Sequence, residues 1–237
     1  MRRIVSSVVA VLLASALPAF ADALTRSDRR VLRQAAQVLE ISTSAPDKGI
    51  PRELLERAEC VLVFPGVKKG AFIVGGKYGR GVATCRQDNG QMGPPSFYIT
   101  GGGSIGFQWG GNEADLVLLV MNKDGVKYLL QDKFTVGGEA SAAVGPVGRT
   151  AQAATDAQLR AQILSWSRSR GLFAGAALEG AVVKPSPDAN ERLYGRTVTG
   201  EEILVGSKLK VPSAAKEFAQ TARRLSGRGD VESASKR

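Results

Sequence analysis

Residues 60–85 read CVLVFPGVKKGAFIVGGKYGRGVATC, a segment that combines apolar runs with frequent glycines. The apolar residues from Cys60 to Phe64 predict a strand that ends at Pro65. Segments 71–78 and 81–86 predict two more strands, which glycine interrupts repeatedly. Glycine weakens strand pairing but permits bulges and strong coiling. Half of the chain's 28 glycines lie in residues 66–111, so we expect a strongly curved sheet, a partial barrel, rather than a flat one.

The rest of the chain predicts an α+β domain. Six further segments are typical of strands: 96–100, 104–109, 116–121, 136–144, 163–167 and 172–183. Short helices are predicted over 123–131 and after the capping box Thr199–Glu202. Ser213 is the expected N-cap of a last helix that runs through Leu225. We therefore expect a mainly antiparallel, glycine-rich sheet with N-terminal amphipathic helices and a C-terminal helix.

The segment before the sheet predicts two helices. Thr25 is the expected N-cap of the first, with Asp28 three residues on, and this helix should run to about Ile41. One face is apolar and carries Val31, Leu32, Ala35, Val38 and Leu39. The other face carries Arg26, Arg29, Arg30 and Arg33. Pro51 opens a second helix that runs to about Glu59.

The arginine-bearing helix has two interpretations. It can be an ordinary surface helix that docks on the sheet by its apolar face, with its arginines solvated. It can also be an amphipathic helix that lies on an anionic membrane, where arginine pairs with phosphate. The residues alone leave both open. Lys68 and Lys69, expected in the turn at 65–67, would supply a second cationic contact.

The first residues have the three parts of a cleavable signal peptide. Arg2 and Arg3 precede an apolar run, and residues 19–21 form a small-x-small cleavage site. We expect removal of residues 1–21, a single domain over 22–225, and a polar, disordered tail over 226–237. No cysteine lies near the cleavage site, so a lipoprotein is not expected. The predicted location is periplasmic or secreted, with peripheral membrane association.

The chain has two cysteines, Cys60 and Cys85, and both would reach an oxidising compartment. An even pair in such a compartment indicates a disulfide, here between two neighbouring strands. Two buried free thiols are the alternative, because the sequence does not show that the sulfur atoms meet.

Several observations argue against catalysis. The sequence contains no histidine, which excludes a Ser-His-Asp triad and imidazole metal sites. Residues 101–106 match both G-x-G-x-x-G and, around Ser104, G-x-S-x-G, but a strand follows where a helix is needed and the histidine base is missing. Ser213 and Lys216 match S-x-x-K without its companion motifs. We predict no catalytic residue, no metal ligand and no cofactor.

The formal net charge of +10 predicts an anionic partner. An exported protein does not normally meet nucleic acid, so the partner is expected to be an anionic phospholipid membrane, an acidic polysaccharide or an acidic protein. Charge alone does not choose among these three.

Blocks of residues along the chain resemble the SYLF lipid-binding domain family, in the form of a single-domain exported bacterial-type member. The blocks lie between residues 31 and 225 and follow the family's order. They are Cys60–Pro65, Lys69–Phe72, Gly75–Gly81, Pro95–Phe97, Gly103–Gly110, Asp115–Leu119, Gly145–Arg149, Ser167–Gly175, Leu178–Gly180 and Tyr194–Gly195. Each block alone is weak, but so many in order make the resemblance specific.

The resemblance implies phospholipid binding, with phosphoinositides favoured in eukaryotic relatives, and no catalysis. In those relatives a basic amphipathic N-terminal segment contacts the membrane, a role that would fall here on Arg26, Arg29, Arg30 and Arg33. Eukaryotic relatives also bind actin filaments and carry an SH3 or FYVE module. Neither module is evident in this sequence, and export would remove the protein from actin, so actin binding is not expected.

Three functions are consistent with these observations. The first is an exported protein that docks peripherally on anionic membranes through a basic amphipathic surface. The second is a soluble carrier that encloses a lipid tail in an apolar pocket inside the curved sheet. The third is an envelope scaffold that binds an acidic partner. A convex basic face beside the N-terminal helix would favour the first, and an internal apolar pocket the second.

Overall fold

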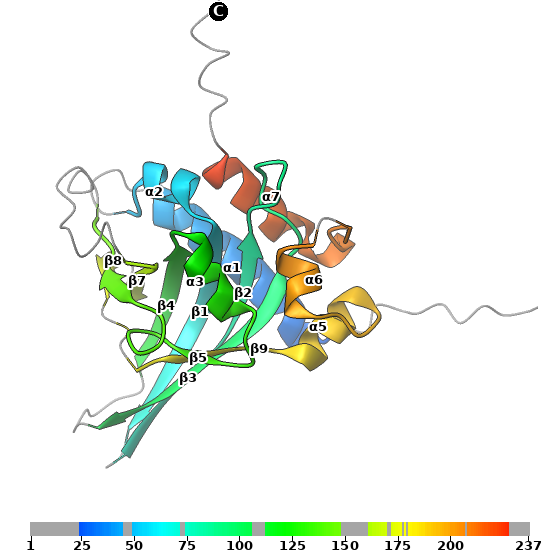
Figure 1. Cartoon of the computed structure of the whole chain (residues 1–237). Coiled ribbons are helices and arrows are strands. Elements are labelled where there is room, and N and C mark those ends of the chain that lie inside the picture. The colour runs from blue at the N-terminus through cyan, green and yellow to red at the C-terminus, as the bar shows by residue number, and fades with distance from the viewer. Residues whose placement is uncertain are drawn as a thin grey trace, which may run out of the picture.

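A computed structural model describes most of the region after the proposed signal peptide. The described residues are 24–44, 49–71, 74–105, 112–147, 161–169, 172–176, 178, 180–206 and 208–227. The proposed signal peptide (1–21) and residues 228–237 of the proposed tail lie outside them. Within them, helices cover both faces of one sheet (Figure 1).

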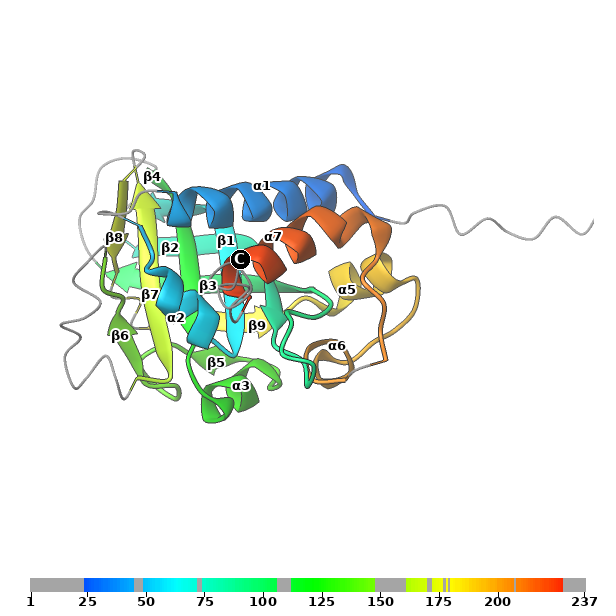
Figure 2. The same cartoon turned by 90° about the horizontal axis from the view of Figure 1, so that it is seen from above.

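The sheet has nine strands in its described residues, in the order β5-β9-β3-β2-β1-β4-β7-β6, with β8 beside β7. They are β1 (Cys60–Ala71), β2 (Val74–Cys85), β3 (Ser96–Ile105), β4 (Asn112–Val120), β5 (Phe134–Thr135), β6 (Ala142–Val144), β7 (Ile163–Ser169), β8 (Leu172–Gly175) and β9 (Val182–Pro185). All strand pairs are antiparallel except β6 with β7. Both ends of the sheet bend toward one side (Figure 2). The prediction of an α+β fold with a strongly curved, mainly antiparallel sheet is confirmed.

The helices divide between the two faces of the sheet. They are α1 (Arg26–Thr43), α2 (Arg52–Arg57), α3 (Lys123–Leu129), α5 (Pro187–Tyr194), α6 (Gly200–Leu204) and α7 (Lys216–Ser226). Side chains of α1, α2 and α7 share one hydrophobic core with the outer face of the sheet. Side chains of α3 and α6 share a second core with the inner face. Figure 2 shows α1 and α3 on opposite sides of the strands.

The apolar run that opens β1 is unbroken because both faces of this strand are buried. Successive side chains of a strand point to opposite faces. Val61 and Val63 belong to the core beneath α1, whereas Leu62 and Phe64 belong to the core inside the curl. All four side chains are 0% exposed. The first residues of β1 therefore form the layer between the two cores.

The predicted strand ends within the glycine-rich segment were wrong. β1 does not stop at Pro65 but continues through a bulge between Phe64 and Val67. Gly66 takes a positive φ of 59° there, a conformation that glycine adopts without strain. Lys68 and Lys69 therefore lie in a strand, not in a turn. Segments 71–78 and 81–86 likewise belong mainly to a single strand, β2, because bulges and coiling absorb the glycines without ending the pairing.

Three other predictions need correction. In their described residues, the segments predicted as long strands over 136–144 and 172–183 contain only short strands, and helix α5 was not among the predicted elements. Ser213 does not cap the last helix: it opens a 3-10 turn after Pro212, and α7 begins only at Lys216. The N-cap residue of α7 is Ala215, whose methyl side chain cannot accept a capping hydrogen bond.

The two cysteines are bonded, as predicted. Cys60 and Cys85 are direct partners in the β1–β2 register, and their sulfur atoms are 2.04 Å apart. Both side chains are buried. The disulfide therefore joins the first residue of β1 to the last residue of β2.

Candidate functional site

Helix α1 docks on the sheet by its apolar face. The stripe predicted from the sequence, Val31, Leu32, Ala35, Val38 and Leu39, is at most 8% exposed. It packs in one core with side chains of β1, β2 and β7, among them Val61, Val82 and Trp166. Of the two interpretations of this helix, the structure therefore supports the first for the apolar face, which docks on the sheet. The stripe is not available at the surface for contact with lipid.

The N-terminus of α1 is fixed by a buried carboxylate. Asp28 and Thr25 form the capping box, with hydrogen bonds of 3.0 and 3.1 Å. The carboxylate of Asp28 also accepts hydrogen bonds from Arg80 of β2 and from Arg192 of α5. Burial alone would raise the pKa of Asp28, but the hydrogen bonds from Arg192, Arg80 and Thr25 outweigh it and hold that pKa well below its usual range.

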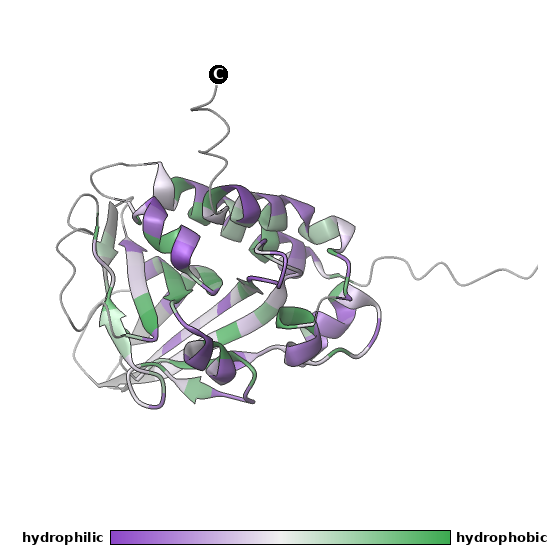
Figure 3. Ribbon diagram, turned by 45° about the horizontal axis from the view of Figure 1, so that its top comes forward, coloured by the Kyte–Doolittle hydropathy of each residue, from purple (hydrophilic) through white to green (hydrophobic). Residues whose placement is uncertain are grey.

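The four predicted arginines lie on the outward side of α1. Arg26, Arg30 and Arg33 are exposed, and Arg29 is half-buried. Their spacing places them on one side of the helix over two turns. Asp28 is the only acidic residue between Arg26 and Leu39, and it is fully buried. Hydrophilic and hydrophobic residues alternate along α1 and α7 in Figure 3, as expected for helices with one buried face.

Helix α7 lies beside α1 and adds exposed basic residues that the sequence analysis did not single out. Arg224 forms an ion pair with Glu40 near the end of α1. Arg223 donates a hydrogen bond of 2.7 Å to the carbonyl oxygen of Met92. These contacts join α7 to α1 and to the sheet. The sequence predicted a last helix through Leu225, but the position of α7 against α1 depends on tertiary packing.

The two lysines proposed as a second contact lie beyond the β1 bulge. Lys68 is exposed, and its Nζ is 3.6 Å from a carboxylate oxygen of Glu113 on β4. It lies opposite Tyr78 of β2 in the sheet register, and Tyr78 is 55% exposed. The side chain of Lys69 lies outside the described residues.

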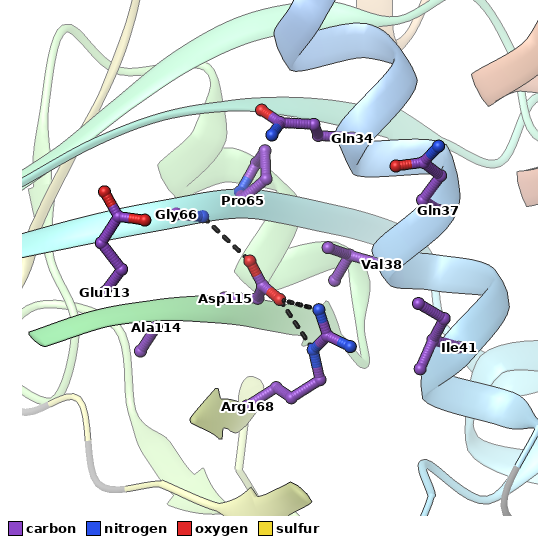
Figure 4. Close-up of a pocket in the computed structure, with 10 residues that line it drawn as sticks. All are labelled: Gln34, Gln37, Val38, Ile41, Pro65, Gly66, Glu113, Ala114, Asp115 and Arg168. Atoms are coloured by element: carbon purple, nitrogen blue, oxygen red, sulfur yellow. Dashed lines mark hydrogen bonds and ion pairs between the residues drawn. The ribbon is translucent and has the colours of Figure 1, made fainter. Parts of the chain in front are cut away.

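A groove of about 290 Å³ lies between α1 and the sheet (Figure 4). Gln34 and Gln37 line it from the helix, and Asp115 of β4 and Arg168 of β7 line it from the sheet. Arg168 donates a hydrogen bond of 2.8 Å from Nε to Asp115. None of these four residues was predicted as a site residue. Asp115 and Arg168 lie in two of the blocks that carry the family resemblance, but only the register of β4 with β7 places them side by side.

Side chains of the described residues form a packed hydrophobic core inside the curl. Tyr98, Phe134 and Leu118 are at most 2% exposed there. The hydroxyl group of Tyr98 donates a hydrogen bond of 2.6 Å to the carbonyl oxygen of Leu129, and burial raises the pKa of this tyrosine. This packed core does not favour a carrier with an internal pocket.

Neither a candidate metal site nor a membrane-spanning helix is found among the described residues. They contain no group of three or more histidine, cysteine, aspartate or glutamate side chains that could hold a metal ion. Residues 101–105 of the glycine motif belong to β3 and do not form a turn before a helix. None of the helices in the described residues has the length and apolar character needed to cross a membrane.

Comparison with known proteins gives an independent result. The family described as "Ysc84: Las17-binding protein actin regulator" matches residues 101–225. The chain is 36% identical over 169 residues to an SH3 domain-containing protein of Schizosaccharomyces pombe, an alignment that covers 70% of this chain and 39% of that protein. It is 31% identical over 194 residues to Protein YSC84 of Saccharomyces cerevisiae, covering 81% and 41%. It is 32% identical over 193 residues to SH3 domain-containing YSC84-like protein 1 of Xenopus laevis, covering 78% and 57%. The chain thus spans about two-fifths of the length of the first two relatives.

Proposed function

The chain belongs to the Ysc84/SYLF domain family, and on this premise we propose that it binds anionic phospholipid membranes through the outward arginines of α1, without catalysis. We further propose that it is exported and acts at the membrane surface of the periplasm or outside the cell. A disulfide is typical of proteins in oxidising compartments, and the Cys60–Cys85 bridge supports this part of the proposal.

The observation that carries the proposal is the separation of the two faces of α1. The inward face is buried in the core, and the outward face bears Arg26, Arg30 and Arg33 without an exposed acidic residue among them. Each cation close to an anionic bilayer contributes roughly 1 kcal/mol to binding. Arginine also forms paired hydrogen bonds with phosphate oxygens. An electrostatic contact with lipid headgroups therefore requires no rearrangement of the fold.

The same separation argues against deep insertion. Before its apolar stripe could enter a bilayer, α1 would have to leave the sheet and break the contacts of Asp28 with Arg80 and Arg192. We therefore expect α1 to stay docked while its arginines contact headgroups. Binding of this kind should weaken strongly as added salt shortens the screening length from about 10 Å at 0.1 M to about 3 Å at 1 M.

Liposome sedimentation tests the proposal. The test variant carries Arg26→Glu, Arg30→Glu and Arg33→Glu. Its matched control carries Lys123→Glu, Lys133→Glu and Lys184→Glu, three exposed lysines outside α1 with the same total change in charge. We expect the wild-type protein to bind phosphatidylcholine liposomes only when they contain phosphatidylglycerol. The arginine variant should bind these liposomes at least about tenfold more weakly, and the lysine variant should stay close to the wild type.

Three results would contradict the proposal. Equal binding by the wild type and the arginine variant would place the lipid site elsewhere, with Lys68 and Lys69 the next residues to test. Equal losses in both variants would mean that net charge, and not the α1 surface, controls binding. No binding to any liposome would favour an acidic protein or polysaccharide as the partner. The description of the matching family refers to Las17 binding and actin regulation, which we do not extend to a protein proposed to be exported.

A further inference from the structure

The groove beside α1 is not used by the proposed membrane contact. α1 crosses the strands, so one flank of the helix faces a row of sheet residues. At its start, Ser27 accepts a hydrogen bond of 2.8 Å from Arg80 of β2. Further along, the flank opens over the β1 bulge at Gly66 and then over Asp115 and Arg168 (Figure 4).

The floor of this groove is held in a fixed orientation. One carboxylate oxygen of Asp115 accepts a hydrogen bond of 2.9 Å from the backbone N–H of Gly66. The other is 2.8 Å from the guanidinium group of Arg168. The two side chains are only 14% and 25% exposed. The bulge turns the N–H of Gly66 toward Asp115, and bulges often orient groups in this way beside binding sites.

The wall formed by α1 is amphipathic. Gln34 and Gln37 are exposed, and in the described part of the chain neither side chain has a hydrogen-bond partner. Each amide can both donate and accept hydrogen bonds. Ile41, one turn further on, is 42% exposed and gives the same wall an apolar part. The groove therefore offers donors, acceptors and an apolar surface at short range.

We propose that this groove binds a polyhydroxylated ligand of about one sugar ring. In the groove Asp115 is already paired with Arg168, and Glu113 at its edge lies 3.6 Å from Lys68, which is outside the lining. A free anion would meet the carboxylates of Glu113 and Asp115, and a free cation would meet the guanidinium group of Arg168. Neighbouring hydroxyl groups can instead donate to carboxylate or amide oxygens and accept from amide N–H groups, while the C–H face of the ring lies on Ile41. The volume is close to the lower end for small-ligand pockets, about 300–1,000 Å³.

Titration of the ¹⁵N-labelled protein by NMR tests this inference, which does not depend on membrane binding. The probes are D-glucose, D-galactose and N-acetyl-D-glucosamine, and cyclohexanol is the control ring with a single hydroxyl group. With at least one sugar we expect saturable shifts of the Gly66 amide and of the Gln34 and Gln37 side-chain amides. The expected Kd is on the order of 1 mM. Cyclohexanol should cause no such shifts.

A double variant, Gln34→Ala with Gln37→Ala, should fold normally because both residues are exposed helical positions. It should weaken sugar binding about tenfold, as expected for two lost hydrogen bonds. Gln220→Ala makes the same change at an exposed position of α7 and should leave binding unchanged. The inference is wrong if no sugar causes saturable shifts, if cyclohexanol causes the same shifts, or if the double variant binds as well as the wild type.

Neutral liposomes that carry a galactosyl lipid distinguish two natural ligands, a glycolipid headgroup and a free saccharide. If the natural ligand is a glycolipid, these liposomes should bind the wild type and the Arg26→Glu, Arg30→Glu, Arg33→Glu variant alike, and free galactose should compete. The double glutamine variant should then fail to bind them. If the ligand is a free saccharide, the NMR shifts should occur without binding to these liposomes.

Discussion

Two groups of arginines lie on opposite sides of the first turns of α1, and their surroundings differ. Arg80 and Arg192 converge on Asp28, which is fully buried. Arg26 and Arg33 project from the other side of the helix and are exposed. We call Asp28 with Arg80 and Arg192 the α1 anchor. We call the exposed residues Arg26, Arg30 and Arg33 the outer face.

The difference shows that the role of an arginine depends on its partner rather than on its neighbours in the sequence. In the anchor, each guanidinium group offsets the cost of burying one carboxylate. On the outer face, solvated arginines contribute little to folding and can exchange water for phosphate oxygens. We therefore expect changes in the anchor to alter stability and changes in the outer face to alter binding.

The largest effect is expected from Asp28→Ala. This change leaves Arg80 and Arg192 without their shared carboxylate and removes the capping box. Breaking a buried ion pair by removing one partner costs about 3–5 kcal/mol. Urea unfolding should show a loss in that range. Liposome binding by the folded fraction should remain, because the outer face is unchanged. A loss below about 1 kcal/mol would mean that the anchor does not hold α1.

Loss of the disulfide should have the next largest effect and should spare the outer face. The Cys60–Cys85 bridge closes a separation of 25 residues, which corresponds to about 3 kcal/mol from restriction of the unfolded chain. Dithiothreitol should lower the unfolding free energy of the wild type by that amount, and the urea midpoint should fall accordingly. The double variant Cys60→Ala, Cys85→Ala should unfold at the lower midpoint with or without the reductant. An unchanged midpoint under reduction would show that the bridge does not restrict the unfolded chain.

The sequence could predict what depends on local patterns. Thr25 and Asp28 have the spacing of a capping box, and the apolar run at β1 requires burial on both faces. The disulfide followed from two cysteines in a proposed oxidising compartment. The second role of Asp28 was not predictable, because Arg80 and Arg192 are 52 and 164 residues away in the chain.

The candidate groove was still less predictable from the sequence. Its floor depends on a bulge that lets β1 continue past Pro65, where the sequence predicted the end of the strand. Asp115 and Arg168 are 53 residues apart and become neighbours only through the register of β4 with β7. Register is fixed by the whole buried face of a sheet rather than by any single motif.

The pH dependence of the unfolding free energy tests the anchor while keeping a side chain of the same shape at position 28. The pKa of Asp28 is lower in the folded protein than in the unfolded chain, where it should be near 4. The carboxylate therefore stabilises the fold fully above about pH 4 and progressively less as the pH falls below that value. The unfolding free energy of the wild type should fall more steeply below pH 4 than that of Asp28→Asn. Parallel profiles would contradict the assigned ionisation.

A matched pair of single changes compares the two regions directly. Arg192→Ala removes one of the two arginines of the anchor, and we expect a loss of about 1–2 kcal/mol of stability with unchanged liposome binding. Arg33→Ala removes one arginine of the outer face, and we expect liposome binding to weaken about fivefold with stability changed by less than about 0.5 kcal/mol. The opposite pattern would reverse the roles that we assign to the two groups.

The smallest effect is expected at Glu40, where the outer face meets α7. Glu40 forms an ion pair with Arg224, and both side chains are about half exposed. Exposed ion pairs contribute about 0.2–1 kcal/mol, so Glu40→Gln should lower stability only slightly. It also removes a negative charge from the same helix as the outer arginines and releases Arg224. Binding to anionic liposomes should therefore rise about twofold at low salt and return to the wild-type level at high salt. Glu217→Gln, on an exposed residue of α7, controls for the change in net charge. An equal rise in that control would assign the effect to net charge, and a fall in binding by Glu40→Gln would mean that the ion pair orients α1 for membrane contact.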